Sequence, residues 1–123
     1  MLSEQQIVST LEGIAANLPG FIAASLVDLD SGMTLGLYSK DPSFDLNSAS
    51  AFNSEMVKQK IKIMDVLGLD GRLEDMLLTM SDQIHLIRLI NSGTFLYLAA
   101  DRSASNLAIV RNAVASHADQ LAS

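Results

Sequence analysis

The stretch LEDMLLTMSDQIHLIRLINSGTFLYLAA, residues 73–100, contains three short apolar runs separated by two groups of turn residues. Ser81-Asp82 lies between the first and second runs, and Asn91-Ser92-Gly93 lies between the second and third. Short apolar runs joined in this way predict a meander of antiparallel strands. Apolar residues also stand at consecutive positions, as in Leu86-Ile87, so we expect a sheet that is covered on both faces. The predicted strands are residues 73–80, 84–90 and 94–100.

A predicted β-hairpin lies closer to the N-terminus. Residues 21–29 are mostly apolar, and residues 33–38 continue in an extended pattern. Asp30-Ser31-Gly32 between them supplies turn residues, because Asp hydrogen-bonds locally and Gly tolerates positive φ. The chain therefore contains five predicted strands, two before residue 40 and three after residue 72.

Three predicted helices separate and flank these strands. Ser3 and Gln6 form a capping box at the start of the first helix, which ends at Pro19-Gly20. The second helix is expected to start at an N-cap on Asn47 or Ser48 and to run to about Leu67. Its apolar stripe consists of Phe52, Met56 and Ile63, with Ala49 and Val57 adjoining. Asp101 to Ser103 is expected to cap the third helix, whose predicted buried stripe is Leu107, Val110, Val114, Ala118 and Leu121.

The resulting order is α-ββ-α-βββ-α, within a length that suits one domain, residues 1–123. We expect an α+β fold with one five-stranded antiparallel sheet between helices. The two terminal helices are expected to cover one face, and the middle helix is expected to cover the other.

Composition excludes several classes of function. The net charge of −6 and the pI near 4.6 disfavour binding to nucleic acid or to an anionic membrane. The absence of cysteine excludes thiolate chemistry and fits a reducing cytoplasm, and the sequence has neither a signal peptide nor an apolar run long enough to span a bilayer. We therefore expect a cytoplasmic protein without membrane insertion. The hydrophobic content of 49% is high for a small chain, which suggests that some apolar surface contacts a partner.

No credible catalytic constellation is found in the sequence. Asp30-Ser31-Gly32 matches the catalytic turn of aspartic proteases, but the same tripeptide is a common hairpin connector. Asp28 and Asp30 could bind a hard cation, yet the other oxygen ligands of a Ca²⁺ loop are missing. His85 is expected in a strand and His117 on an exposed helix face, without acidic ligands at a recognisable spacing. No phosphate-binding loop is present, so we expect no catalytic residue, no metal, no cofactor and no enzymatic activity.

The order of elements and two local segments resemble the Roadblock/dynein light-chain family. The segments are Leu67-Gly68-Leu69-Asp70-Gly71-Arg72-Leu73-Glu74 before the meander and Asn106-Leu107-Ala108-Ile109-Val110-Arg111 in the last helix. The resemblance covers essentially the whole chain and implies a profilin-like fold. It also implies a homodimer in which the middle helix and the third strand of each copy meet. The residues carried over to this interface are Phe52, Met56, Lys60 and Ile63 on the helix, and Met76, Leu77, Leu78, Thr79 and Met80 on or beside the strand.

Two questions about this surface stay open at the level of sequence. A one-residue change of register exchanges Met76 and Leu78 with Leu77 and Thr79, so the strand face toward the helix is undecided. The stripe of the middle helix could simply cover the sheet instead of a partner. Lys58, Lys60 and Lys62 could meet an acidic partner, although a solvated helix face is the simpler reading.

Three functions compete. The resemblance implies a homodimeric module that binds and regulates a small Ras-like GTPase, and Arg72, Arg88, Arg102 and Arg111 are available as arginine fingers without any reason to select one. A scaffold or cytoskeletal and motor-associated adaptor without GTPase specificity is the first alternative. A small-molecule sensor, or an enzyme that the motifs do not reveal, is the second, and a defined concave polar pocket would favour it.

Overall fold

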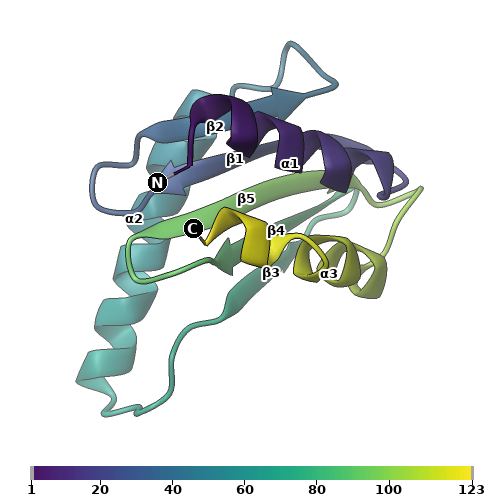
Figure 1. Cartoon of the computed structure of the whole chain (residues 1–123). Helices are drawn as coiled ribbons and strands as arrows, with labels where there is room; N and C mark the ends of the chain where they lie inside the picture. Colours follow the sequence, from purple (N-terminus) through teal and green to yellow (C-terminus); the bar gives the residue numbers. More distant parts are fainter. Residues whose placement is uncertain (1, 123) are drawn as a thin grey trace.

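A computed structural model describes residues 2–122 and has the predicted order α-ββ-α-βββ-α (Figure 1). Residues 1 and 123, which the expected domain 1–123 includes, lie outside the described part. The strands fall within about two residues of their predicted positions. The elements are α1 (Glu4–Ala16), β1 (Phe21–Asp28), β2 (Thr34–Ser39), α2 (Leu46–Val66), β3 (Asp75–Thr79), β4 (Gln83–Leu89), β5 (Thr94–Asp101), α3 (Leu107–Ala115) and a short 3₁₀ helix η1 (Ala118–Leu121).

The five strands form one antiparallel sheet in the order β2-β1-β5-β4-β3. The hairpin β1-β2 and the meander β3-β4-β5 are joined through β1 and β5, the first and last strands of the sheet along the chain. This arrangement places β5 at the centre, where it is almost entirely buried. It also places β2 at one edge of the sheet and β3 at the other.

One face of the sheet is covered by α1 and α3, as predicted. Ile7, Leu11 and Ile14 of α1 are buried in the same hydrophobic cluster as Val110 and Val114 of α3. The predicted capping box starts α1, with Ser3 Oγ accepting from Gln6 N at 3.1 Å and Gln6 Oε1 accepting from Ser3 N at 2.8 Å. Gly36 of β2 lies directly under this helix, because a Cβ there would approach Ile7 Cγ2 to 2.6 Å. A glycine is therefore required where α1 crosses β2.

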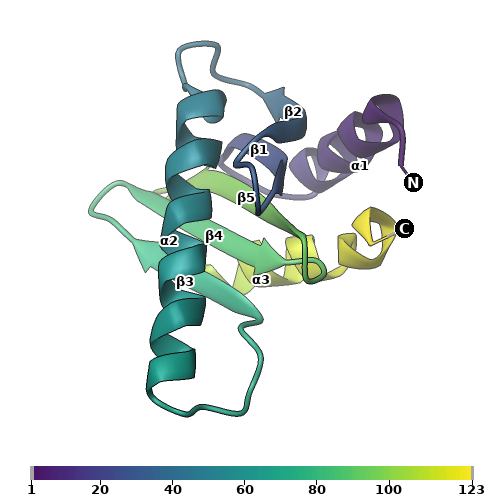
Figure 2. The ribbon, with the colours of Figure 1, turned by 90° about the vertical axis from the view of Figure 1, so that its left-hand side faces the viewer.

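The other face is covered by α2 alone. Figure 2 shows α2 lying across the sheet, with its C-terminal turns continuing beyond β3. Its contacts with strands are made mainly with β1 and β2. A second hydrophobic cluster lies between α2 and the sheet and contains Val57 of α2 together with Ile87, Phe95 and Tyr97.

Two predicted helix starts are wrong. The N-cap of α2 is Asp45, whose side chain accepts from Ser48 N at 3.1 Å, so the helix begins before Asn47. The N-cap of α3 is Asn106, because Asp101 instead accepts from Ser103 in a turn that closes β5. Several residues with side chains suited to capping precede each helix, and tertiary packing decides which of them is used.

The third helix is also shorter than predicted. It ends at Ala115, and Ala118 and Leu121 belong to η1. Val110, Val114 and Leu121 are buried as expected, whereas Leu107 is 41% exposed. His117 lies between the two helices and is partly buried, with its Nδ1 3.0 Å from Ala113 O, so its prediction as an exposed helical residue is wrong.

The β1-β2 turn has the predicted position but a different hydrogen-bonding residue. Asp28, and not Asp30, accepts from the backbone and the hydroxyl of Ser31, at 2.9 and 2.6 Å. These bonds lower the pKa of the Asp28 carboxyl below its ordinary value. Gly32 follows with φ of 74°, the left-handed conformation that favours glycine. Asp28 therefore acts in this turn as a structural acceptor.

Candidate interaction surface

The side of α2 that rests on the sheet is made of small residues. Ser50, Ser54 and Val57 are fully buried. The larger side chains of Phe52 and Ile63 are exposed. Ser54 Oγ donates to Leu29 O at 2.5 Å, and Ser50 Oγ lies 3.0 Å from Ser25 Oγ of β1. Each buried hydroxyl thus has a hydrogen-bond partner, which removes the cost of burying it.

Small side chains let α2 approach the β1-β2 turn closely. A Cβ on Gly32 would lie 3.3 Å from Ala51 Cα and 3.6 Å from Ser54 Cβ.

Lys58 Nζ donates to Asp30 O at 3.2 Å and also pairs with Glu55 at 3.1 Å. Lys58 is therefore engaged in holding the turn, and the three lysines of α2 do not act as one basic patch.

The predicted apolar stripe lies on the opposite side of α2. Phe52 is 77% exposed and Ile63 is 39% exposed, while Met56 and Lys60 are partly buried. Leu67, one turn after Ile63, is 64% exposed. Phe52 and Ile63 do not cover the sheet, because Ser50, Ser54 and Val57 occupy that position. Met56 covers it in part, since it packs against the cluster beneath α2. An apolar helix face in water is unfavourable by about 25 cal/mol per Å² of apolar surface, so a partner would gain from covering it.

The third strand, β3, has one open edge. Within residues 2–122 it pairs with β4 and with no other strand, and it carries neither proline nor lysine to block a further strand. Met76 and Leu78 pack against the cluster beneath α2, whereas Leu77 packs against the cluster beneath α1 and α3. Thr79 pairs with Ile84, which belongs to that same α1 and α3 cluster. The open question of register is thus answered: Met76 and Leu78 share the α2 side of the sheet.

These two features form one candidate site, which we call the α2–β3 surface. Met56 of α2 and Met76 and Leu78 of β3 pack partly against the same cluster on this face of the sheet. Met80 is 37% exposed and lies just beyond the strand, in the turn where its carbonyl accepts from Arg102 at 3.0 Å. The α2–β3 surface consists of Phe52, Met56, Lys60, Ile63, Leu67, Met76, Leu78 and Met80.

An ion cluster fixes the start of β3. Asp75 Oδ2 lies 3.0 Å from both Nε and a terminal nitrogen of Arg111 on α3, and 3.8 Å from Arg88 of β4. Arg88 and Arg111 are thereby engaged in structure, which weakens their candidacy as arginine fingers. Arg102 is bound to the Met80 carbonyl, so Arg72 is the member of that group without an ion pair or side-chain hydrogen bond within residues 2–122.

A polar chain lies under the N-terminal half of α2. His85 Nε2 donates to Gln83 Oε1 at 2.7 Å, which leaves His85 Nδ1 to accept from the Tyr97 hydroxyl at 3.0 Å. Phe44 packs against both rings, at centroid distances of 6.3 and 6.4 Å. Burial lowers the pKa of His85 although the negative charge of Asp82 opposes this, and burial raises the pKa of Tyr97 to about 12. The geometry therefore holds a neutral histidine inside the fold.

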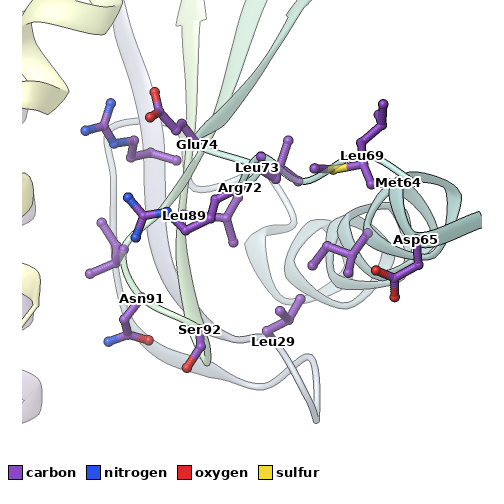
Figure 3. A pocket seen from close by; sticks show the side chains of 14 residues that line it. Leu29, Met64, Asp65, Leu69, Arg72, Leu73, Glu74, Leu89, Asn91 and Ser92 are labelled. Carbon is purple, nitrogen blue, oxygen red and sulfur yellow. The ribbon is translucent and has the colours of Figure 1, made fainter. Parts of the chain in front are cut away.

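The structure also has a cleft that the sequence did not reveal. It has a volume of about 600 Å³ and lies between the C-terminal turns of α2, the loop 67–74 and the β4-β5 turn. Figure 3 shows Met64 and Leu69 on the α2 side, and Arg72 extending toward the side where Asn91 and Ser92 lie. No sequence motif marks this cleft, because its walls come from four separate segments.

Two properties that bear on function hold for the described residues. Among residues 2–122, no three histidine, aspartate or glutamate side chains are grouped so that they could hold a metal ion. No helix in the same range is both long enough and apolar enough to cross a membrane.

Comparison with known proteins identifies the fold. No family model and no curated protein matches the chain in sequence. Among solved structures, Myxococcus xanthus MglB is similar with a TM-score of 0.87 and 15% identity, over 99% of this chain and 90% of that one. The gliding protein MglB from Thermus thermophilus has a TM-score of 0.84 and 17% identity, over 97% of this chain and 87% of that one.

A third solved structure bears a more general name. The Roadblock/LC7 domain from Streptomyces avermitilis has a TM-score of 0.79 and 18% identity, over 96% of this chain and 92% of that one. At these identities the agreement concerns the fold, which extends over nearly the whole length of each protein. This chain has the profilin-like α+β fold of the Roadblock/LC7 domains.

Proposed function

We propose that this chain is a non-catalytic, homodimeric interaction module that binds and regulates a small Ras-like GTPase in the cytoplasm. The observation that carries the proposal is the α2–β3 surface, where an exposed apolar helix face adjoins an open sheet edge. The Roadblock fold supports it further, because the family resemblance implies both self-association through these elements and binding to such GTPases. The partners are a second copy of the chain and the GTPase, without binding to nucleic acid and without direct insertion into a membrane.

The proposed dimer joins two β3 edges in antiparallel fashion. Both copies of α2 then lie on the same face of one continuous sheet and, by the two-fold symmetry, run antiparallel. Four apolar residues of the α2–β3 surface, Phe52, Met56, Ile63 and Leu67, are spaced symmetrically along the chain about a point between Gln59 and Lys60. Phe52 of one copy is therefore placed opposite Leu67 of the other, and Met56 opposite Ile63. Both contacts occur twice, as an isologous interface requires.

A cysteine at the symmetry point tests this geometry, since the chain has no cysteine of its own. Gln59→Cys is expected to form a disulfide-linked dimer under mild oxidation, because the proposed symmetry brings the two copies of residue 59 close together. A disulfide in general requires two Cβ atoms about 4 Å apart. Gln5→Cys, on the exposed side of α1, is the matched control and should remain monomeric on a non-reducing gel. Equal crosslinking of the two variants would contradict the antiparallel arrangement.

Regulation requires that the dimer discriminate between two states of the GTPase. A module without catalytic groups acts by shifting the conformational equilibrium of its partner's switch segments. The size of that shift is limited by the difference between its affinities for the two nucleotide states. The proposed dimer has the net acidic charge of its two chains, whereas α2 carries three lysines, Lys58, Lys60 and Lys62, of which Lys58 pairs with Glu55. We expect the GTPase to bind across the paired helices on the side that faces away from the contact between the copies, where Lys62 is exposed.

The experiment is capture from the native lysate on the immobilised chain, with GDP or a non-hydrolysable GTP analogue. A recovered small GTPase would be purified, and its affinity for the chain measured in both nucleotide states. A difference of at least about tenfold, corresponding to about 1.4 kcal/mol, supports regulation. Equal affinity for both states would overturn regulation and favour the adaptor function. If no GTPase binds directly, the proposed partner is wrong.

A further inference from the structure

We propose that the cleft at the C-terminal end of α2 is a binding site for a small carboxylate ligand with an aliphatic body. The site is separate from the α2–β3 surface and does not depend on the function proposed above. Its volume of about 600 Å³ falls within the usual range for small-molecule sites, roughly 300 to 1,000 Å³.

The floor of the cleft suits an aliphatic body. Ile61 and Met64 continue the sheet-facing side of α2 past Val57, but the helix has by then left the sheet, and Ile61 is 36% exposed. Leu29 and Leu89 face the same space from the ends of β1 and β4 (Figure 3). Apolar side chains from α2 and from the sheet thus line a gap that no side chain of residues 2–122 fills.

Arg72 supplies the positive charge that a carboxylate requires. Its guanidinium has five donors and, within residues 2–122, no ion pair or side-chain hydrogen bond. Arg88 also lines the cleft, and its 3.8 Å pairing with Asp75 leaves donors free. An arginine fork matches the two oxygens of a carboxylate and forms charge-assisted hydrogen bonds with them.

The Asn91-Ser92 turn gives this side of the cleft a fixed shape. Asn91 Oδ1 accepts from Gly93 N, Thr94 N and Thr94 Oγ1 at 2.8, 2.9 and 3.0 Å. Three bonds to one oxygen hold the turn rigid, and Ser92 adds a hydroxyl to the lining. A ligand would therefore meet a polar wall that is already ordered before binding.

Two acidic residues, Asp65 and Glu74, also line the cleft, so its charges balance overall. Both carboxylates are exposed and thus largely solvated at the rim. Figure 3 shows Asp65 on α2, away from the side that Arg72 reaches. Arg72 and Glu74 both lie away from Asp65, with apolar side chains between. The guanidinium of Arg72 supplies hydrogen-bond donors at that end, whereas the Glu74 carboxylate is exposed to solvent. The affinity of a ligand should therefore depend both on the length of its aliphatic chain, which contacts the apolar side chains, and on the charge of its head group, which contacts Arg72.

Octanoate is the probe, with octan-1-ol and octylammonium as ligands of equal length but different charge. We expect octanoate to bind at least about tenfold more tightly than octan-1-ol at low ionic strength, and octylammonium to bind more weakly than octanoate. In methyl NMR spectra, the shifts should centre on Leu29, Ile61 and Leu89. Equal affinity for all three ligands, or shifts centred elsewhere, would overturn the proposal.

Arg72→Met tests the role of the guanidinium while keeping an apolar stem. We expect it to weaken octanoate binding by at least about tenfold and to leave octan-1-ol binding unchanged. Lys62→Met removes the same charge from α2 outside the cleft, and it should alter neither affinity by more than about twofold. If the two variants weaken octanoate binding equally, the effect is one of net charge and the proposed site is wrong.

Discussion

The helices α1 and α2 cover opposite faces of one sheet, yet they use their large apolar residues in opposite ways. In α1, Ile7, Leu11 and Ile14 are directed at the sheet and are almost completely buried. In α2, Ser50 and Ser54 rest on the sheet, and Phe52 and Ile63 are exposed. The difference teaches that an apolar stripe identifies a surface that should be covered, but not what covers it. In α1 it is the protein's own sheet, and in α2 we infer that it is a second copy.

The largest effect on stability is expected in α1, the helix whose large apolar residues face the sheet. Leu11→Ala removes a fully buried side chain from the α1 core and should lower the free energy of unfolding by about 2 to 5 kcal/mol. Urea unfolding followed by circular dichroism measures the change. The matched variant Leu35→Ala, at a half-exposed position in β2, should cost less than about 1 kcal/mol. Equal costs would mean that the α1 core is not packed as described.

A smaller effect is expected where α2 approaches the β1-β2 turn. Ser54→Leu adds bulk at a fully buried position and removes the hydrogen bond to Leu29 O, so it should destabilise the fold by about 1 to 3 kcal/mol. Lys62→Leu introduces leucine at an exposed position of the same helix, outside the α2–β3 surface, and should remain within about 0.5 kcal/mol of the wild type. A tolerated leucine at position 54 would show that α2 does not require small residues there.

The stability of the fold should depend on pH through the polar chain beneath α2, which contains His85. Burial lowers the pKa of His85, so the unfolded chain binds its proton more readily than the folded chain. The stabilisation from neutral His85 is complete above the unfolded pKa of about 6.5 and is lost as pH falls toward the lower folded value. His85→Gln should abolish the slope of unfolding free energy against pH in that window. Hydrogen bonds from Ser31 hold the pKa of Asp28 below its ordinary value, so the slope from this carboxylate lies at lower pH and should persist.

The sequence predicted most of the fold because its signals are local. The Ser3-Gln6 capping box, the turn residues and the spacing of apolar residues all act over a few positions. The capping box forms as predicted, and the strands and turns lie close to their predicted positions, although Asp28 and not Asp30 is the acceptor in the β1-β2 turn. Local signals fail where several residues compete, as when Asp45 and not Asn47 or Ser48 caps α2. They also fail for β3, whose orientation depends on pairing with β4 and not on its own apolar run.

The candidate site was only partly predictable. Phe52, Met56 and Ile63 form a visible stripe, but its direction depends on Ser50 and Ser54, which look like ordinary surface residues in the sequence. Their spacing of four on one helix side, beside Val57, was the available signal for close packing. The cleft could not be found in this way, since its lining residues come from separate segments that meet only in the folded chain.

Sedimentation equilibrium of the wild type and of Phe52→Glu tests the central claim most directly. Phe52 is 77% exposed, so the substitution should leave the unfolding of the monomer within about 0.5 kcal/mol of the wild type. We predict that the wild type is a dimer and that Phe52→Glu is a folded monomer. Met33→Glu, a change at another exposed position near the β2 edge, should remain dimeric. A monomeric wild type, or a Phe52→Glu protein that dimerises as strongly as the wild type, would contradict the account.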